Sequence, residues 1–274
     1  MERRPGGKTK ARVRVVTREG ARWRADHLAT EEPLEIRIVA GGITRTIAVT
    51  MRTPGADFEL AAGFLRGEGV VATRDDIRRI AYCTDPDLDA AQQYNVVSVE
   101  LATRTLPDPR RLERHSFTNS SCGVCGKAGL DALEIAGCSV LPPGPEVSEE
   151  VLYGLPDRLR EAQGLFDSTG GLHAAGLFTV AGEALCVRED VGRHNAVDKL
   201  VGWALLAGHL PLAEHLLFVS GRCSFEIMQK ALVAGIPVVC AVSAPSSLAA
   251  SVAHQFGMTL IGFLREGRFN VYVG

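Results

Sequence analysis

The sequence has no long hydrophobic run, no surplus of charge of one sign and no dense pattern of cysteines. No stretch reaches the roughly 18 consecutive apolar residues that a membrane-spanning helix needs. The formal net charge is -2, from 30 Lys and Arg against 32 Asp and Glu, so no broad basic face for nucleic acid is indicated. We therefore expect neither a membrane nor a nucleic acid among the partners of this protein.

Cysteine usage and the N-terminus both argue against export. The seven cysteines are an odd number without the even spacing of a secreted disulfide scaffold. The first residues are basic, and no apolar segment follows them as a signal peptide would require. We expect a cytoplasmic protein in a reducing compartment, with residues 1–12 forming a disordered basic leader.

One pair of cysteines stands out by its spacing and its neighbours. Two residues separate Cys122 from Cys125, and both lie among small residues between Ser120 and Lys127. Backbone N–H groups and the ammonium of Lys127 would favour a reactive thiolate on such an accessible loop. The spacing alone leaves three chemistries open: a zinc site, a thioredoxin-like disulfide pair and other sulfur chemistry.

The regions before and after this loop differ in periodicity. The sequence predicts a smaller α+β domain without a catalytic signature over residues 13–115. The CxxC loop and a linker follow at residues 116–146, and an α/β domain is predicted over residues 147–274. Helices that alternate with continuous apolar strands in the last region indicate a layered sheet covered on its faces.

The expected elements follow from apolar periodicity and turn residues. In the first region they are a strand hairpin over 34–39 and 43–51, a helix capped by Asp57 and ended by Gly67, a polar helix at 75–80 and a strand at 95–101. In the last region the expected helices are one that begins at Ser148, a long one at 195–206 capped by Asp190, and two at 224–233 and 247–256. The expected strands there are 176–180, 184–187, 216–219, 236–242, 258–263 and 269–273.

Two strand-to-helix turns are candidate anion sites. The first is Ser220, Gly221 and Arg222, and the second covers residues 242–247. Free N–H groups at a helix start attract anions, and ligands of open α/β sheets bind outside the carboxyl ends of strands. The alternative is that each serine only caps the following helix.

A third candidate is the turn between the last two strands. Arg265 and Arg268 flank Gly267, which suits a tight turn, and guanidinium groups bind phosphate in a bidentate manner. Segments 167–173 and 188–195 are dense in polar groups and glycine and could line a pocket. His173 and His194 are each interpreted as structural histidines rather than as ligands.

Several of these segments together resemble the FdhD family of sulfur carrier proteins, which formate dehydrogenase needs for activity. The resemblance rests on five segments in the expected order, namely 121–126, 169–173, 189–199, 220–222 and 263–268.

The resemblance implies a persulfide sulfurtransferase. Its members take sulfur from a cysteine desulfurase and pass it to the molybdenum of a bis-molybdopterin guanine dinucleotide cofactor for apo formate dehydrogenase. On this sequence, Cys122 would hold the persulfide and Cys125 would assist. The guanine dinucleotide would contact the last turn, which comprises Phe263, Leu264, Arg265, Glu266, Gly267 and Arg268. The resemblance also implies a cytidine-deaminase-like fold for residues 147–274, a homodimer and no intrinsic metal.

Three hypotheses stay open from the sequence. The zinc signature of a deaminase, His-x-Glu together with Pro-Cys-x-x-Cys, is incomplete, because no His-x-Glu occurs and a serine precedes Cys122. The first hypothesis is the sulfurtransferase, and the second is a non-catalytic chaperone for the molybdenum cofactor. The third is a small zinc-binding or disulfide-exchange protein, for which His115 could supply a further zinc ligand.

Overall fold

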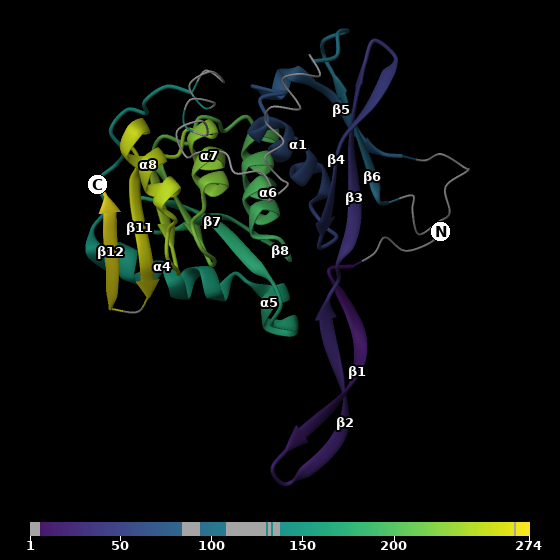
Figure 1. Cartoon of the computed structure of the whole chain (residues 1–274), viewed down its shortest axis with the longest axis vertical. Coiled ribbons are helices and arrows are strands. Elements are labelled where there is room, and N and C mark those ends of the chain that lie inside the picture. The colour runs from purple at the N-terminus through teal and green to yellow at the C-terminus, as the bar shows by residue number, and fades with distance from the viewer. Residues whose placement is uncertain (1–5, 84–93, 108–129, 131–132, 134–137, 266) are drawn as a thin grey trace.

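The structure, a computed structural model, describes residues 6–83, 94–107, 130, 133, 138–265 and 267–274. Cys122, Cys125 and Glu266 lie outside the described residues. Within the described residues the strands form three sheets, of two, four and six strands (Figure 1).

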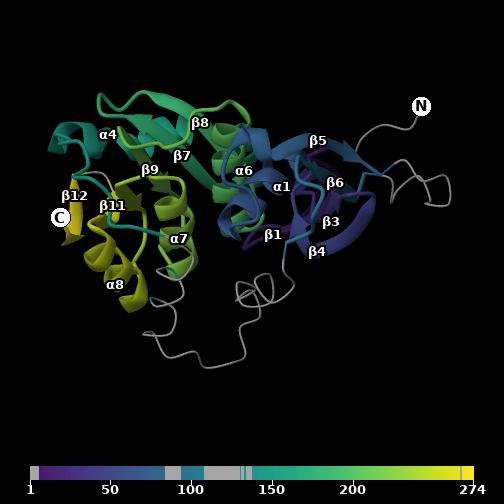
Figure 2. The same cartoon turned by 90° about the horizontal axis from the view of Figure 1, so that it is seen from above.

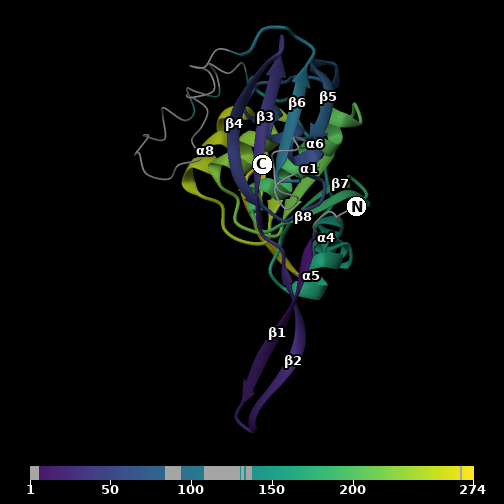
Figure 3. The same cartoon turned by 90° about the vertical axis from the view of Figure 1, so that its right-hand side faces the viewer.

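A two-stranded ribbon begins the chain. Strands β1 (Lys8–Thr17) and β2 (Gly20–Ala29) pair antiparallel along their full length. The ribbon extends away from the rest of the molecule (Figures 1 and 3). The prediction of a disordered leader over residues 1–12 is therefore wrong for residues 8–12. Cations alternate there with Thr9 and Ala11, which is a strand pattern, and the tight turn before Gly20 leads into the partner strand.

The four-stranded sheet has the order β4-β3-β6-β5, with helix α1 (Asp57–Gly67) against one face. Its strands are β3 (Glu32–Ala40), β4 (Ile43–Arg52), β5 (Ile77–Tyr82) and β6 (Val96–Leu101). The alternation predicted for the first hairpin is confirmed, because Leu34, Ile36 and Ile38 are all fully buried against the α1 side.

Two local predictions in this part are wrong. The polar helix expected at 75–80 is a single 3₁₀ turn, Arg74–Asp76, followed by β5, because pairing with β6 buries Ile77. Asp57 is the first residue of α1 rather than its cap, and Ala56 takes the N-cap position. The Asp57 carboxylate instead accepts hydrogen bonds from the buried guanidinium of Arg52 at 3.2 and 3.1 Å.

The six-stranded sheet has the order β12-β11-β10-β9-β7-β8. The central strands β9, β10 and β11 are parallel, while β7, β8 and β12 pair antiparallel with their neighbours. Its strands are β7 (His173–Thr179), β8 (Ala184–Asp190), β9 (His215–Val219), β10 (Val238–Ala241), β11 (Thr259–Arg265) and β12 (Arg268–Val273). The helices of this part are α4 (Glu149–Glu161), α5 (Gly164–Thr169), α6 (Arg193–Leu206), α7 (Phe225–Val233) and α8 (Ser247–Phe256).

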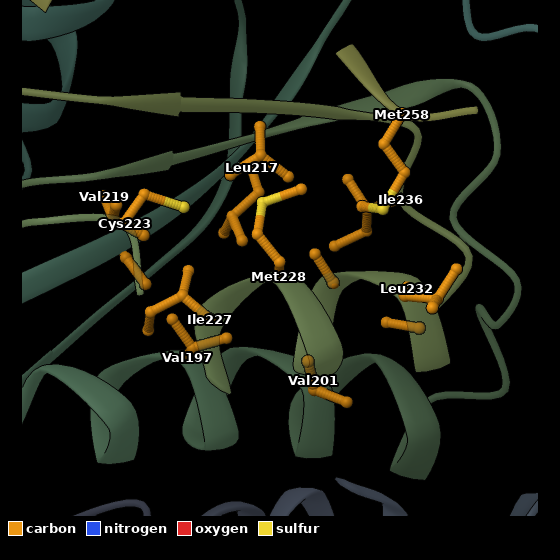
Figure 4. Packing of buried hydrophobic residues seen from close by; sticks show 14 of the residues in the cluster. Val197, Val201, Leu217, Val219, Cys223, Ile227, Met228, Leu232, Ile236 and Met258 are labelled. Carbon is orange, nitrogen blue, oxygen red and sulfur yellow. The ribbon is translucent and has the colours of Figure 1, made fainter. Parts of the chain in front are cut away.

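Helices cover both faces of this sheet, as the sequence predicts. Leu216 and Phe218 of β9 pack with α4, whereas Leu217 and Val219 point to the other face. On that other face Val197 and Val201 of α6 and residues of α7 meet the strands (Figure 4). A pattern of continuous apolar residues is what a strand buried on both faces requires.

Helices α1 and α6 join the two large sheets (Figure 2). A Cβ atom on Gly63 would lie 1.8 Å from the backbone oxygen of Asp198, and one on Gly202 would lie 1.8 Å from that of Glu59. The backbones of α1 and α6 are therefore so close together at these two positions that a side chain larger than that of glycine does not fit. The layers run from the six-stranded sheet through α6 and α1 to the four-stranded sheet.

Candidate functional site

The carboxyl ends of the parallel strands carry the candidate site. The turn after β9 is tied to β7, because Ser220 Oγ accepts a hydrogen bond from the Ala174 N–H at 2.9 Å. The next residue, Gly221, has no side chain and so leaves room for the side chains of His173 and Arg193. A Cβ there would lie 3.4 Å from His173 Nδ1 and 3.7 Å from Arg193 Cδ. The structure thus brings together three of the segments that the sequence singled out, with Gly221 between them.

Arg193 and His194 begin helix α6, directly beside this turn. The Nε atom of Arg193 is buried and has no hydrogen-bond partner among the described residues. Burial and the nearby Arg193 charge lower the pKa of His173. The same causes lower the pKa of His194 to about 4. Both imidazoles are therefore neutral near pH 7.

Helix α7 supplies the polar groups that face His194. His194 Nε2 lies 3.2 Å from Ser224 Oγ and 3.7 Å from Glu226 Oε2. Ser224 is the N-cap residue of α7, but its hydroxyl makes no capping hydrogen bond. Ser224 thus contacts His194 rather than acting as an ordinary helix cap, and the ends of α6 and α7 form one polar cluster with Gly221.

The second predicted turn has a structural role. Ser246 Oγ accepts a hydrogen bond from the Ala249 N–H at 3.2 Å and caps α8. The backbone N–H of Ser246 donates to Cys223 O at 2.9 Å, so this turn and the turn after β9 lie side by side. The alternative interpretation as a helix cap is confirmed for Ser246.

The β11–β12 turn lies at the same edge of the sheet, because β9, β10 and β11 run in parallel. Gly267 adopts a positive φ of 75° and makes the tight turn expected of it, with Arg265 paired opposite Arg268. Leu264 is fully buried in the core on the α4 side. The Leu264 side chain is therefore inaccessible from the surface. Of this residue, only the backbone is available for the predicted contact with the cofactor.

A buried ion pair fixes α6 next to this cluster. Lys199 Nζ lies 2.6 Å from Asp190 Oδ2, and both side chains are at most 2% exposed. Asp190 also accepts hydrogen bonds from the backbone N–H of Thr53 at 3.1 Å and of Gly192 at 2.8 Å. The prediction that Asp190 caps the helix is wrong in position, since Gly192 is the N-cap. The carboxylate instead ties the start of α6 to the end of β4.

Comparison with known proteins identifies the family of this chain. The sequence model of the FdhD/NarQ family matches residues 29–274. The chain belongs to the FdhD/NarQ family. The family predicted from the sequence motifs is thereby confirmed.

Relatives of this FdhD/NarQ-family chain match it over nearly its whole length. A sulfur carrier protein FdhD from Streptomyces avermitilis is 53% identical over 272 residues, which is 98% of this chain and 95% of the relative. The protein of the same name from Sulfurisphaera tokodaii is 46% identical over 248 residues, 90% of this chain and 89% of the relative.

The fold is shared with a solved structure. A Desulfotalea psychrophila protein assigned as a formate dehydrogenase accessory protein superposes on this FdhD/NarQ-family chain with a TM-score of 0.72. The two are 24% identical, and the match covers 97% of each chain. This likeness supports the mixed α/β architecture predicted from the sequence.

Four of the five cysteines that the structure describes in this FdhD/NarQ-family chain are poor nucleophiles. Burial raises the pKa of Cys186 to about 11 and that of Cys223 to about 12, and it also raises the pKa of Cys138 and Cys240. These four remain thiols near pH 7, whereas sulfur transfer needs a thiolate. No group of His, Cys, Asp or Glu suited to a metal ion occurs among the described residues. Nor does any described helix have the length and apolarity to cross a membrane.

Sequence reasoning missed part of this polar cluster. Arg193 lies in one of the segments that carry the family resemblance but had no predicted role, and Ser224 and Glu226 were predicted only as residues of the helix at 224–233. The available signal was the run Arg193-His194-Asn195, which begins a helix directly after a strand. His173 and His194, interpreted as separate structural histidines, both lie within range of the Arg193 charge.

Proposed function

We propose that this protein is a sulfur carrier that receives persulfide sulfur from a cysteine desulfurase on Cys122. It then transfers the sulfur to the molybdenum of bis-molybdopterin guanine dinucleotide, in the cytoplasm, for use by apo formate dehydrogenase. The observation that carries the proposal is 53% identity to a sulfur carrier protein over 98% of this chain.

The first chemical step needs only a thiolate. The Cys122 thiolate attacks the outer sulfur of the desulfurase persulfide, the sulfur–sulfur bond of the donor breaks, and the desulfurase cysteine leaves as a thiolate. A persulfide then resides on Cys122, with no net oxidation. Delivery of that outer sulfur to molybdenum as a sulfide breaks the sulfur–sulfur bond and returns Cys122 to the thiolate, and the two electrons that this step consumes come from a reduced molybdenum centre of the cofactor substrate. Four of the five described cysteines are held as thiols by burial, which favours a role for Cys122 and Cys125.

The cofactor side of the proposal rests on cations at one edge of the sheet. Arg222 and Arg265 are exposed there, and Arg268 lies across the turn from Arg265. Guanidinium groups are suited to the phosphates of a guanine dinucleotide. The proposal includes no intrinsic metal, a cytidine-deaminase-like arrangement of residues 147–274 and a homodimer.

Mass spectrometry of the intact protein tests the sulfur step. After incubation with a cysteine desulfurase and cysteine, the wild type is expected to gain one sulfur that dithiothreitol removes. Cys122→Ala should abolish this gain, because the accepting thiolate is lost. Cys83→Ala is the matched control and should load as the wild type does. Unchanged loading of Cys122→Ala would refute the assignment.

Two further variants separate the carrier from a cofactor chaperone, a function that the cationic edge of the sheet would also suit. Arg265→Ala combined with Arg268→Ala should weaken guanine nucleotide binding by about tenfold or more while persulfide loading stays intact. A chain that lacks both Cys122 and Cys125, and yet binds the cofactor and fully activates the recipient enzyme, would identify a chaperone instead.

A further inference from the structure

A cavity lies where helices α1 and α7 end, away from the cationic edge of the six-stranded sheet. Its volume is about 230 Å³, and Leu133, Leu141 and Leu232 give it apolar walls. The Gly221 cluster lies at the start of α7 and the cavity at its end, and a helix of 9 residues is about 13 Å long. Pockets for drug-sized ligands measure roughly 300–1,000 Å³. The cavity is therefore a separate site, and it is too small for a dinucleotide.

Two hydrogen bonds hold the two helix ends together at this cavity. Arg66 Nη2 donates to Val233 O at 2.6 Å, and Gln229 Nε2 donates to Gly67 O at 3.4 Å. The last turns of both helices thus form part of the cavity wall. The C-terminus of a helix carries partial negative charge, which attracts a cation and repels an anion. This part of the wall therefore favours a positively charged group.

The Glu68 carboxylate adds a full negative charge beside these helix ends. Burial raises the pKa of Glu68 to about 7. Lys230, whose charge opposes that shift, is already ion-paired with Asp198 at 2.6 Å. Among the described residues the Glu68 carboxylate has no hydrogen bond and no ion pair. A partly buried carboxylate at a helix C-terminus is unfavourable without a partner, so this position is suited to a ligand that brings a cation.

Arg66 presents the opposite charge to the same cavity. Its Nε atom is buried and has no hydrogen-bond partner in the part of the chain that the structure describes. A buried donor without an acceptor is costly, and a bound acceptor would remove that cost. The charges that act on Arg66 are those of Cys138 and Asp76, so Arg66 and Glu68 do not neutralise each other. One cavity therefore holds a carboxylate and a guanidinium that both lack a full set of partners.

We propose that this cavity binds an amino acid, with the ligand ammonium at Glu68 and the ligand carboxylate at Arg66 Nε. A ligand with a single charge would satisfy only one of these two groups and would bring that charge near the like charge of the other. A zwitterion satisfies both, and the apolar walls are suited to a small aliphatic side chain. This inference does not depend on sulfur transfer.

Isothermal titration calorimetry of the full chain with each protein amino acid tests the proposal. At least one small amino acid is expected to give a saturable heat below about 10 mM. The best ligand is then compared with its two single-charge analogues, the carboxylic acid without the amino group and the amine without the carboxylate. Each analogue should bind at least tenfold more weakly, because one of the two charge contacts is lost.

Substitutions at the two ends of the cavity locate the ligand. Glu68→Gln and Arg66→Gln should each weaken binding of the best amino acid at least tenfold. The matched control is Glu19→Gln, an exposed carboxylate at the turn of the β1–β2 ribbon, which should bind as the wild type does. Urea unfolding of each variant verifies the fold, and Glu68→Gln should be at least as stable as the wild type at pH 7. Cys122→Ala should also bind normally, so a failure of this proposal is distinguishable from a failure of the sulfur-carrier proposal.

Proton release gives a second readout. Part of the Glu68 population carries a proton at pH 7, and an ammonium group beside the carboxylate would displace it. The binding heat at pH 7 should therefore vary with the ionisation enthalpy of the buffer in the wild type but not in Glu68→Gln. The other charged or ionisable groups around the cavity are Arg66, Cys138 and the ion pair of Lys230 with Asp198. The glutamine substitution leaves all of them in place, so it isolates the Glu68 proton.

Four results would overturn the proposal. They are the absence of a saturable heat with any amino acid up to about 10 mM, a single-charge analogue that binds as tightly as the best amino acid, wild-type affinity in Glu68→Gln, and a wild-type binding heat that is the same in every buffer.

Discussion

Burial determines the charge of several side chains in this protein. At the Gly221 cluster both histidines, which lie within range of the Arg193 charge, have a lowered pKa and are neutral near pH 7. An unperturbed histidine has a pKa near 6.5, and the sequence alone does not show which groups lie next to His194. The sequence therefore shows which ionisable residues are present, whereas their protonation states depend on burial and on groups that are distant in the chain.

Glu68 shows the same effect at the other end of α7. It lines a cavity of about 230 Å³ together with Arg66, Cys138 and Gln229. Burial raises its pKa to about 7, despite the opposing charge of Lys230. The folded protein therefore binds a proton that the unfolded chain releases at a lower pH. In the sequence this glutamate appears only as a polar residue after a helix.

Replacing Glu68 tests this pKa. Between pH 4.5 and about 7 the folded state holds the proton more tightly, so the Glu68 contribution to stability is complete at low pH and is lost as pH rises to about 7. Glu68→Gln should therefore raise the free energy of unfolding above pH 7 by roughly 1–3 kcal/mol relative to the wild type. At pH 4 the difference should largely disappear. Urea unfolding at both pH values measures it, and an equal effect at both would contradict the raised pKa.

At the scale of elements, the sequence predicts strands and helices well where one face is apolar. The β3–β4 hairpin and helices α7 and α8 follow the expected periodicity. The β1–β2 ribbon was not predicted, because the basic residues at its start were interpreted as part of a disordered leader. The packing of α1 on α6 was also missed, since a glycine inside a helix indicates neither its partner nor its distance.

Gly202→Ala tests the close approach of these helices. The added methyl group would collide with the backbone oxygen of Glu59, and backbone moves less easily than a flexible side chain. We expect a loss of about 1–3 kcal/mol in the free energy of unfolding, despite the higher helix propensity of alanine. Gly164→Ala is the matched control, because a Cβ there meets nothing within 4 Å, and it should change stability by about 0.5 kcal/mol or less. Equal effects of the two substitutions in urea unfolding would argue against the contact.

For the whole molecule, the sequence predicts an N-terminal α+β part and a C-terminal α/β part but does not show how they join. Leu205 of α6 belongs to the core of the four-stranded sheet and α1. Across the same junction, Arg188 Nη2 donates to Glu59 Oε1 at 2.8 Å, and Lys199 Nζ donates to Thr53 O at 2.8 Å. Helix α6 is therefore buried on the side facing its own sheet and on the side facing α1.

This shared burial predicts that the C-terminal part does not fold alone. A fragment of residues 147–274 would lose the α1 cover over Gly202 and Leu205 and the Thr53 groups that bind Asp190 and Lys199. Buried charges without partners and newly exposed apolar surface both destabilise a fold. We expect the fragment to give a poorly dispersed NMR spectrum and no cooperative urea transition. The full chain with Trp23→Phe should unfold in one transition, in which circular dichroism and Trp203 fluorescence coincide. A well-dispersed fragment with its own cooperative transition would instead show two independent domains.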